Sequence, residues 1–258
     1  MGGVYHGLYL GMNAEPYQGI EEGSSTAEHV LGTFFDDEYG RRFRYSLNGA
    51  GALVAGDLVQ GAIFGGAVTT EQTVAIIGAQ TAIGETKIPV ASLTTSQPTV
   101  DLFAEGWAAF EDTSAVGTYL RRIKGNTALV HTTWADTPMH VEIYDPLPIQ
   151  LETTDFLAMI VNPYKGLVKA VNGTLTGPGL GGVCAPIQAA YYCWVQTKGP
   201  FGVHIKDGVM TIGMGFQIGA STAGTPASMT AALFGQQFGW ALMAGADEGA
   251  GIVWLNCE

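Results

Sequence analysis

The chain has 258 residues, a formal net charge of −12 at pH 7 and an isoelectric point near 4.7. Nucleic-acid binding needs a basic face that neutralises phosphates, so this charge balance argues against such a function. Charged residues make up only 13% of the sequence, against about 25% in an average soluble protein. There are also 37 glycines and 11 prolines. Because long surface helices carry many charged residues, the composition predicts an all-β fold of barrel or sandwich units with hairpins and at most one short helix.

The first 40 residues mix glycines, acids and aromatics without a sustained period of 2 or 3.6, which predicts an extended N-terminal arm over residues 1–40. This segment has seven acidic residues and no Lys or Arg, and three arginines follow it directly. Arms of this kind often fold on a neighbour, although charge runs are also common on solvated strand faces. We expect an interface with a partner to include Phe34, Phe35, Arg41, Arg42 and Arg44.

The region after the arm reads as one β domain over residues 41–170. Residues 44–59 alternate small and large apolar residues between glycines, as short strands do. The β-rich runs 73–77 and 87–91 predict a hairpin with a longer loop. Pro146 and Pro148 bracket Leu147, which rules out a central strand there and indicates an edge or a crossover.

A second hairpin is expected in the same domain. The runs 119–123 and 127–131 flank Lys124-Gly125-Asn126, where Gly and Asn tolerate the positive φ of a tight turn.

The glycine-rich stretch 171–182 is the candidate linker to a C-terminal β domain over residues 183–258. Within that domain, Asp207-Gly208 lies between two alternating runs and is a strong hairpin signal. Residues 230–244 predict a short helix, although Gly235 and Gly239 weaken it.

Three cysteines have neither the number nor the pairing of a disulfide framework, which indicates buried thiols in a reducing cytoplasm. A bridge between Cys184 and Cys193, across neighbouring strands, stays open. The N-terminus has no basic and apolar signal regions, and the long uncharged stretch 208–246 contains many Gly, Thr, Ser and Gln residues. We therefore expect neither secretion nor a membrane-spanning helix.

A search for catalytic or metal-binding motifs gives one weak candidate. Trp134, Asp136, His140, Glu142 and Asp145 include side chains that bind zinc or calcium, but their spacing matches no closed ligand set. On a strand, His140 and Glu142 share a face, where a half-exposed strand carries polar residues in any case. The glycine-rich stretch lacks the pattern of a phosphate loop or of a dinucleotide site. We expect no catalytic residue, no cofactor and no metal.

The aromatic residues Tyr191, Tyr192 and Trp194 have three interpretations. They belong to a core strand with a Tyr hydroxyl at its rim, or they line a sugar-binding shelf or a subunit interface. We include Tyr192 and Trp194 among the expected interface residues.

Six short phrases occur in order along the chain: RYSLNG at 44–49, ALVAGD at 52–57, AEGW at 104–107, DPLP at 145–148, NPYKG at 162–166 and YYCWVQTKGP at 191–200. Together they resemble a family of tailed-phage virion structural proteins regarded as capsid decoration, or head cement, proteins. The last phrase is the most specific of them. Cys193 stands where the family tends to have a small residue such as Gly, and residues 1–40 lie outside the resemblance.

The resemblance implies a subunit that is made in the bacterial host cytoplasm and binds the outer surface of a phage head. It would associate as a homotrimer, tie neighbouring major capsid subunits together and catalyse nothing. Two alternatives remain at this point, a tail, neck or host-binding virion protein and a carbohydrate-processing or carbohydrate-binding β protein.

Overall fold

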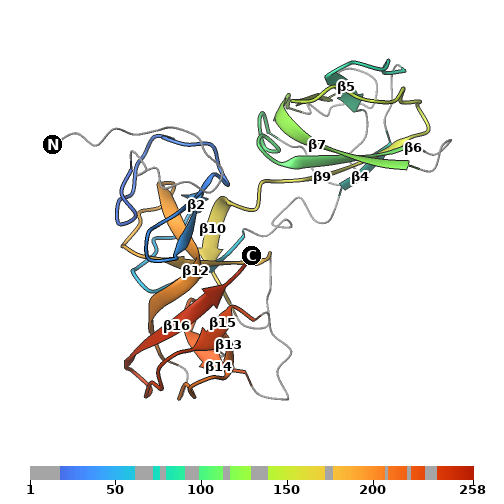
Figure 1. Ribbon diagram of the computed structural model, residues 1–258. Helices are drawn as coiled ribbons and strands as arrows, with labels where there is room; N and C mark the ends of the chain where they lie inside the picture. The colour runs from blue at the N-terminus through green and yellow to red at the C-terminus, as the bar shows by residue number, and fades with distance from the viewer. Residues whose placement is uncertain are drawn as a thin grey trace. The chain divides into compact units, whose positions relative to one another are not determined.

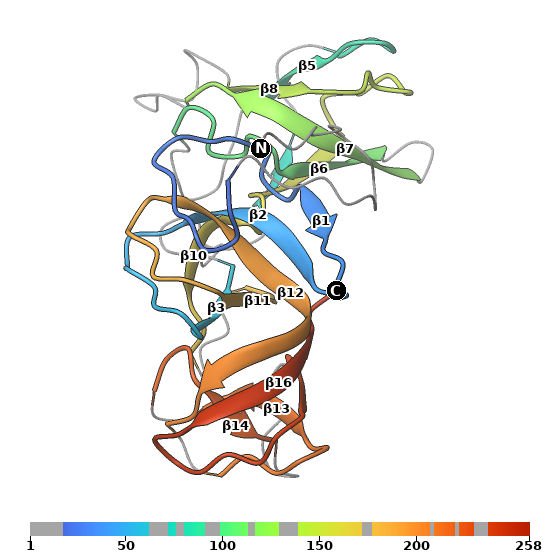
Figure 2. The same cartoon turned by 60° about the vertical axis from the view of Figure 1, so that its left-hand side comes forward.

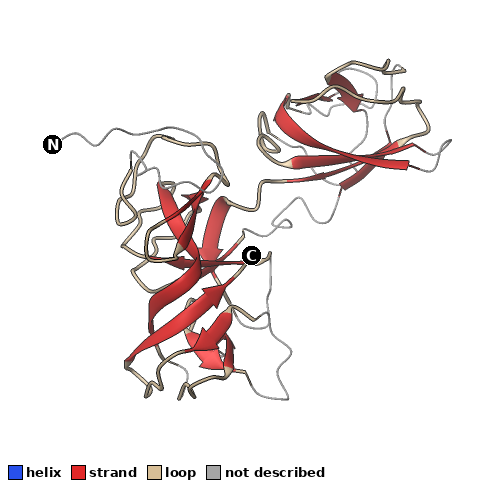
Figure 3. Cartoon of the chain, viewed as in Figure 1, coloured by secondary structure: helices blue, strands red, loops and turns tan. Residues whose placement is uncertain are grey.

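The computed structural model contains sixteen β-strands and no helix within its described residues (Figure 3), which confirms the all-β prediction. The described residues are 18–61, 72–75, 80–90, 99–112, 117–128, 139–171, 177–206, 209–219, 222–229 and 237–258.

The chain divides into two compact units, and the division differs from the expected boundaries. Unit 1 combines residues 1–63 with residues 163–258, and unit 2 is the stretch 64–162 inserted between them (Figure 1). The expected domain 41–170 is therefore wrong as one unit. Its first strands pair with strands from the C-terminal half of the chain, and this long-range pairing leaves no signal in the local sequence.

The described residues of unit 1 form ten strands in one sheet. Their bounds are β1 Phe34–Asp36, β2 Arg42–Asn48, β3 Leu58–Gln60, β10 Lys165–Lys169, β11 Gly179–Val183, β12 Tyr192–His204, β13 Gly215–Ile218, β14 Pro226–Ser228, β15 Gly239–Ala241 and β16 Ala250–Asn256. The order is β1-β2-β10-β3-β11-β12-β16-β15-β13-β14, and β2 also pairs with β12. This extra pairing closes β2, β10, β3, β11 and β12 into a five-stranded barrel.

Strand β12 belongs to both halves of unit 1. Its first residues pair with β2 and β11 in the barrel, and Lys198 to His204 pair with β16 (Figure 2). Cys193 and Val195 point into the barrel core, whereas Phe201 and Val203 pack in a second core beneath β16, β15 and β13. The alternation of apolar residues along one long strand thus supplies both cores.

The predicted linker 171–182 is wrong where the structure describes it, because its glycines form strand β11. Gly181 has a φ of 134°, and a Cβ there would lie 2.0 Å from the carbonyl oxygen of Gln196. A Cβ on Gly182 would lie 2.3 Å from the ring of Phe201. These glycines are required by the close approach of neighbouring strands, not by a flexible connection.

Two further expectations for the C-terminal region differ from the structure. Asp207 and Gly208 lie outside the described residues, but the runs on either side pair elsewhere: Val203 with Gly251, and Met210 with Gly245. The expected hairpin is therefore wrong. The expected helix 230–244 is wrong over 239–241, which form β15, and residues 230–236 lie outside the described part.

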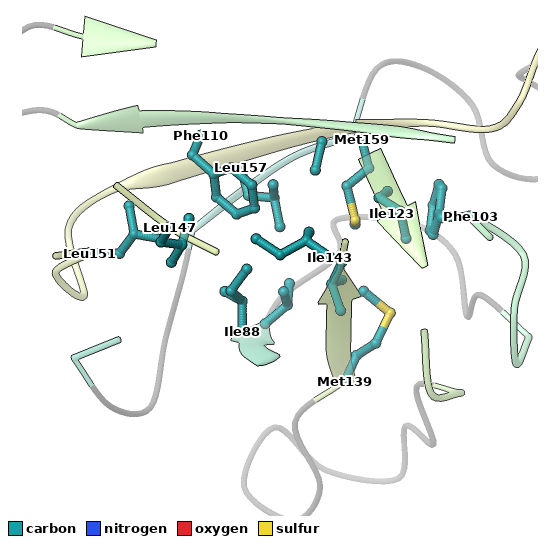
Figure 4. Packing of buried hydrophobic residues seen from close by; sticks show 13 residues of the cluster. Ile88, Phe103, Phe110, Ile123, Met139, Ile143, Leu147, Leu151, Leu157 and Met159 are labelled. Atoms are coloured by element: carbon teal, nitrogen blue, oxygen red, sulfur yellow. The ribbon is translucent and has the colours of Figure 1, made fainter. Parts of the chain in front are cut away.

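Unit 2 contains a six-stranded sheet of order β4-β9-β6-β7-β8-β5. The strand bounds are β4 Gln72–Ala75, β5 Lys87–Val90, β6 Trp107–Asp112, β7 Gly117–Asn126, β8 Met139–Ile143 and β9 Phe156–Ile160. Figure 4 shows side chains of these strands pointing toward one another, with Phe110 and Leu157 opposite Ile88. All three are fully buried, so the curved sheet encloses its own hydrophobic core.

Both hairpins expected in this unit are wrong. Strand β4 pairs with β9, and β5 pairs with β8, so the runs 73–77 and 87–91 do not pair with each other. The expected turn at 124–126 lies inside the continuous strand β7, where the register with β8 shifts between Ile123 and Gly125. A β-bulge of this kind bends the strand, and here it lies where β7 changes partner from β6 to β8.

Of the edge or crossover expected around Pro146 and Pro148, the structure has a crossover. It connects β8 to β9, which are not neighbours in the sheet, and Leu147 between the prolines is buried in the core.

Candidate functional site

The residues expected at an interface come together in unit 1 on the adjacent strands β1, β2 and β12, with Arg41 directly before β2. Phe34 lies opposite Arg44, Phe35 opposite Phe43, and Asp36 opposite Arg42 in the β1–β2 pair. On the other side of β2, Trp194 lies opposite Tyr45 and Tyr192 opposite Leu47. Segments about 150 residues apart in sequence therefore meet in one stretch of sheet, which we call the arginine–aromatic site. Its residues are Phe34, Phe35, Arg41, Arg42, Phe43, Arg44, Tyr45, Tyr192 and Trp194. Phe34, Arg42 and Arg44 lie on one face of the site, and the other aromatic residues lie on the opposite face.

The buried face of this site is a packed aromatic cluster. Trp194 is only 2% exposed, and Phe43 and Tyr45 are fully buried. The ring of Phe35 packs edge-on against Trp194 with centroids 4.7 Å apart and stacks on Phe43 at 4.9 Å. Trp194 donates its indole N–H to the carbonyl oxygen of Gln18 at 2.9 Å. Trp194 is therefore a core residue with a satisfied polar atom and not an exposed anchor, which favours the core-strand interpretation of this phrase.

The described part of the expected arm folds onto this cluster and not away from the chain. The hydroxyl of Tyr45 donates to the Gln18 side chain at 2.8 Å and accepts from the backbone N–H of Glu28 at 3.0 Å. The Gln18 amide in turn donates to the carbonyl oxygens of Glu22 and Tyr192. An extended arm over all of residues 1–40 is therefore wrong for residues 18–40, because hydrogen bonds of Gln18 and Glu28 attach this segment to β2 and β12 within unit 1.

The three arginines of the site pair with carboxylates of this same chain. Arg42 binds Asp36 through two bonds of 2.6 and 2.8 Å and reaches Glu258 at 2.7 Å. Arg44 also binds Glu258, at 2.8 Å, and Arg41 binds Asp37 at 2.6 Å. The arginines were expected to attract an acidic partner, but a partner would have to compete with these internal ion pairs. Within unit 1, the pairs hold Asp36, Asp37 and Glu258 against β2 and the residue before it.

The ion pairs with arginine lower the pKa of the Asp36 and Glu258 carboxyl groups. The hydrogen bonds from Arg42 hold the pKa of Asp36 below its ordinary value and outweigh the effect of partial burial. For Glu258, burial favours the neutral form, but the hydrogen bonds from Arg42 and Arg44 outweigh it and lower the pKa. Both carboxylates are thus held in their charged form.

The guanidinium groups also cover aromatic rings. The Cζ atoms of Arg42 and Arg44 lie 4.9 and 5.0 Å from the centre of the Phe34 ring, and Arg41 lies 5.2 Å from Phe43. Each such contact is worth about 0.5–1 kcal/mol at an exposed position. Phe34 is consequently half-buried between two cations, and the site presents a mixed cationic and aromatic surface.

The weak metal candidate does not assemble a site. Strand β8 places His140 and Glu142 on one face, as the period predicts, and Glu142 accepts from the ammonium group of Lys124 at 2.6 Å. Trp134 and Asp136 lie outside the described residues. Over the described ranges, no group of three His, Cys, Asp or Glu side chains is arranged to hold a metal ion.

The three cysteines are free thiols, so the bridge between Cys184 and Cys193 is not formed. Val183 lies opposite Val195, which sets Cys184 level with Trp194 and turns it to the other face of the sheet from Cys193. Burial raises the pKa of Cys193 to about 12 and that of Cys184 to about 11, so neither is an activated nucleophile.

Sequence reasoning missed two exposed apolar faces. In unit 1, Trp240 lies opposite Trp254, and Trp240, Leu242 and Ile252 are 42%, 47% and 46% exposed. In unit 2, strands β6, β7 and β9 together expose large apolar side chains, which are Trp107, Leu120, Phe156 and Ile160. The sequence did contain a signal for these faces. Their strands have large apolar residues at both even and odd positions, a pattern that predicts a strand covered on both faces.

A groove of about 390 Å³ lies beside the first of these faces. It is lined by Arg41, Gly56, Cys184, Gln196, Gly202 and His204, among others. The amide of Gln196 donates to the carbonyl oxygens of Lys198 and Pro200 along its wall, so these backbone groups are already satisfied.

Searches of family models, of curated proteins and of solved structures each give no match to this chain. The described part of the chain contains no helix that is long and apolar enough to cross a membrane.

Proposed function

We propose that this protein is a structural component of a tailed-phage virion that binds major capsid subunits on the outer surface of the head and stabilises the shell without catalysis. The observation that carries the proposal is the exposed apolar face of β15 and β16 in unit 1. Trp240, Leu242 and Ile252 lie on it, beside the half-buried Trp254. Apolar side chains that are contiguous and exposed mark contact surfaces between proteins.

The neighbouring strand extends this face without adding charge. Pro200 of β12 lies opposite Trp254, and Gly202 lies opposite Ile252. Aromatic residues are enriched in the centres of protein interfaces, and charged residues are depleted there. The face therefore has the composition of an interface core, with Lys198 at its edge.

The stabilising effect follows from linkage. A subunit that binds the assembled shell and not its separated parts stabilises the shell by about 2.7 kcal/mol per site at a free concentration one hundred times the Kd. Self-association as a homotrimer would multiply the contacts that each decorating unit makes with the shell.

The test is to add the purified protein to capsids that lack it and to measure co-sedimentation and the temperature at which the capsids open. We expect saturable binding and a higher opening temperature. Trp240→Ser should reduce binding, whereas Tyr144→Ser, which changes an aromatic residue of similar exposure in unit 2, should not. Absence of the protein from purified particles would overturn the proposal.

A host-binding protein that recognises carbohydrate is the second candidate, and the exposed Trp240 favours it as well because sugar rings stack on open aromatic faces. Trp194, which is buried, is not available for this role. Binding to a glycan array that is lost in Trp240→Ser, together with no binding to capsids, would favour this candidate.

A further inference from the structure

The outer face of unit 2 is the exposed side of β9, β6 and β7. Side chains alternate along these strands, and one set, including Phe110, Leu157 and Met159, fills the core. The other set faces outward and includes four large apolar side chains. These are Trp107, Leu120, Phe156 and Ile160, which are 40%, 57%, 39% and 43% exposed.

The register of the three strands arranges the outer face in three rows. The first row is Ile160, Trp107 and Arg122; the middle row is Ala158, Ala109 and Leu120; the third row is Phe156, Glu111 and Thr118. The two alanines of the middle row leave a shallow trough over β9 and β6, between taller side chains on either side and Leu120 at its β7 end. A face with this relief accepts the tall side chains of an opposing surface.

Each outer row carries one charged side chain, and the two charges are opposite. Arg122 lies in the first row and Glu111 in the third, and the rows are four residues, or about 14 Å, apart along the strands. A face that is positive at one end and negative at the other is complementary to a copy of itself turned end for end.

We propose that the outer face of unit 2 binds the same face of a second copy of this chain, around a two-fold axis that runs across the strands along the middle row. This rotation places the first row of one copy against the third row of the other. Ile160 then packs on Phe156, Trp107 packs on the stem of Glu111, and the guanidinium of Arg122 lies within reach of Glu111. Each contact occurs twice.

The middle row makes this packing possible. Ala109 and Ala158 face their own copies across the axis and leave space between the sheets at β6 and β9, whereas Leu120 faces its own copy at β7 and fills the space there. Two packed sheets lie about 10 Å apart, and this spacing is filled by the side chains of the first and third rows.

The polar groups at the edge of the face favour a protein partner over a sugar. Glu105 accepts from Tyr144 and pairs with Arg122, whose guanidinium lies 5.8 Å from the centre of the Tyr144 ring. Glu105 is therefore engaged within the chain, whereas a sugar site needs unpaired polar groups. Arg122 keeps further N–H donors for the second copy.

The contact is small, so the dimer should be weak. Three strands about 4.8 Å apart and five residues of about 3.4 Å each give a footprint of roughly 14 by 17 Å, which is well below the roughly 800 Å² per partner of a standard specific interface. The inference does not rest on capsid binding, and a homotrimer held by other surfaces is a different species of different mass.

The test is sedimentation velocity of the full chain over a wide range of concentrations. We expect a reversible monomer–dimer equilibrium. Ala109→Arg should weaken dimerisation at least tenfold, because it sets two like charges against each other on the axis. The control Ile83→Arg changes a residue that is 67% exposed and lies outside β6, β7 and β9, so it should leave the equilibrium unchanged.

Two further variants test the geometry. Glu111→Arg should weaken the dimer, and adding Arg122→Glu should restore it, with circular dichroism checking that both variants are folded. Ala109→Cys should give a cross-linked dimer with a short bismaleimide, whereas Ile83→Cys and the wild type should not. Wild-type protein that stays monomeric or forms only trimers, or dimerisation unaffected by Ala109→Arg, would overturn the inference. Glycan binding that is lost in Ala109→Arg would overturn it as well.

Discussion

Replacing Gly181 by Ala tests whether the glycine-rich stretch is a strand or a linker. Gly181 lies in β11 between β3 and β12, with a φ of 134°, and the added Cβ would lie 2.0 Å from the backbone oxygen of Gln196. A non-glycine residue held in a sparsely populated region of φ costs about 1–3 kcal/mol. Overpacking costs about 1–3 kcal/mol more, because a backbone atom has to move.

We therefore expect Gly181→Ala to lower the free energy of unfolding of unit 1 by about 2–6 kcal/mol, a large part of the 5–15 kcal/mol typical of a domain. Gly202→Ala is the matched control, because a Cβ there meets no atom within 4 Å. Since glycine inside a strand is destabilising by about 0.5–1 kcal/mol relative to alanine, this change should be neutral or slightly stabilising.

Guanidinium chloride unfolding followed by tryptophan fluorescence measures both variants. The two units can unfold in separate steps, so the transition of unit 1 has to be fitted by itself. If Gly181→Ala unfolds within about 0.5 kcal/mol of the wild type, which is the range of ordinary surface substitutions, the segment is not packed as the structure has it and the linker interpretation returns.

Three other predictions concern titratable groups. The pKa of Asp36 is lowered by Arg42, so this pair stabilises the fold above the unfolded pKa near 4; Arg42→Gln should be less stable at pH 7, with the difference shrinking as acid protonates Asp36. Burial lowers the pKa of His29, so folding favours its neutral form; the wild type should lose stability as pH falls below about 6.5, and His29→Phe should lose less, in thermal melts at each pH. The pKa of Cys193 is raised to about 12, so its reaction with a thiol reagent at pH 8 should require unfolding, and fast labelling of the folded protein would contradict its burial.

The arginine–aromatic site shows which contacts can be predicted from the types of residue alone. Arginines beside an acidic, aromatic segment indicate charge pairing and ring contacts, and both occur. The sequence does not say that Asp36 and Glu258 are the partners of Arg42. Glu258 is 216 residues away in sequence, and only the pairing of β12 with β2 and β16 brings it there. An interface residue and an internal ion pair therefore give the same local pattern.

The sequence by itself determined the class of fold. Low charge, frequent glycine and period-2 alternation, as in Arg42–Asn48, are local properties, and they predict strands before any partner is known. Only the tertiary structure decided which strands pair, because antiparallel neighbours far apart in sequence carry no mutual signal in a single chain. A glycine such as Gly181 occurs both in linkers and in tightly packed strands, so the sequence does not distinguish the two. The carbonyl of Gln196 that excludes a Cβ at Gly181 belongs to another strand. The distance between two strands depends on both of them, so it cannot be predicted from the sequence of either strand alone.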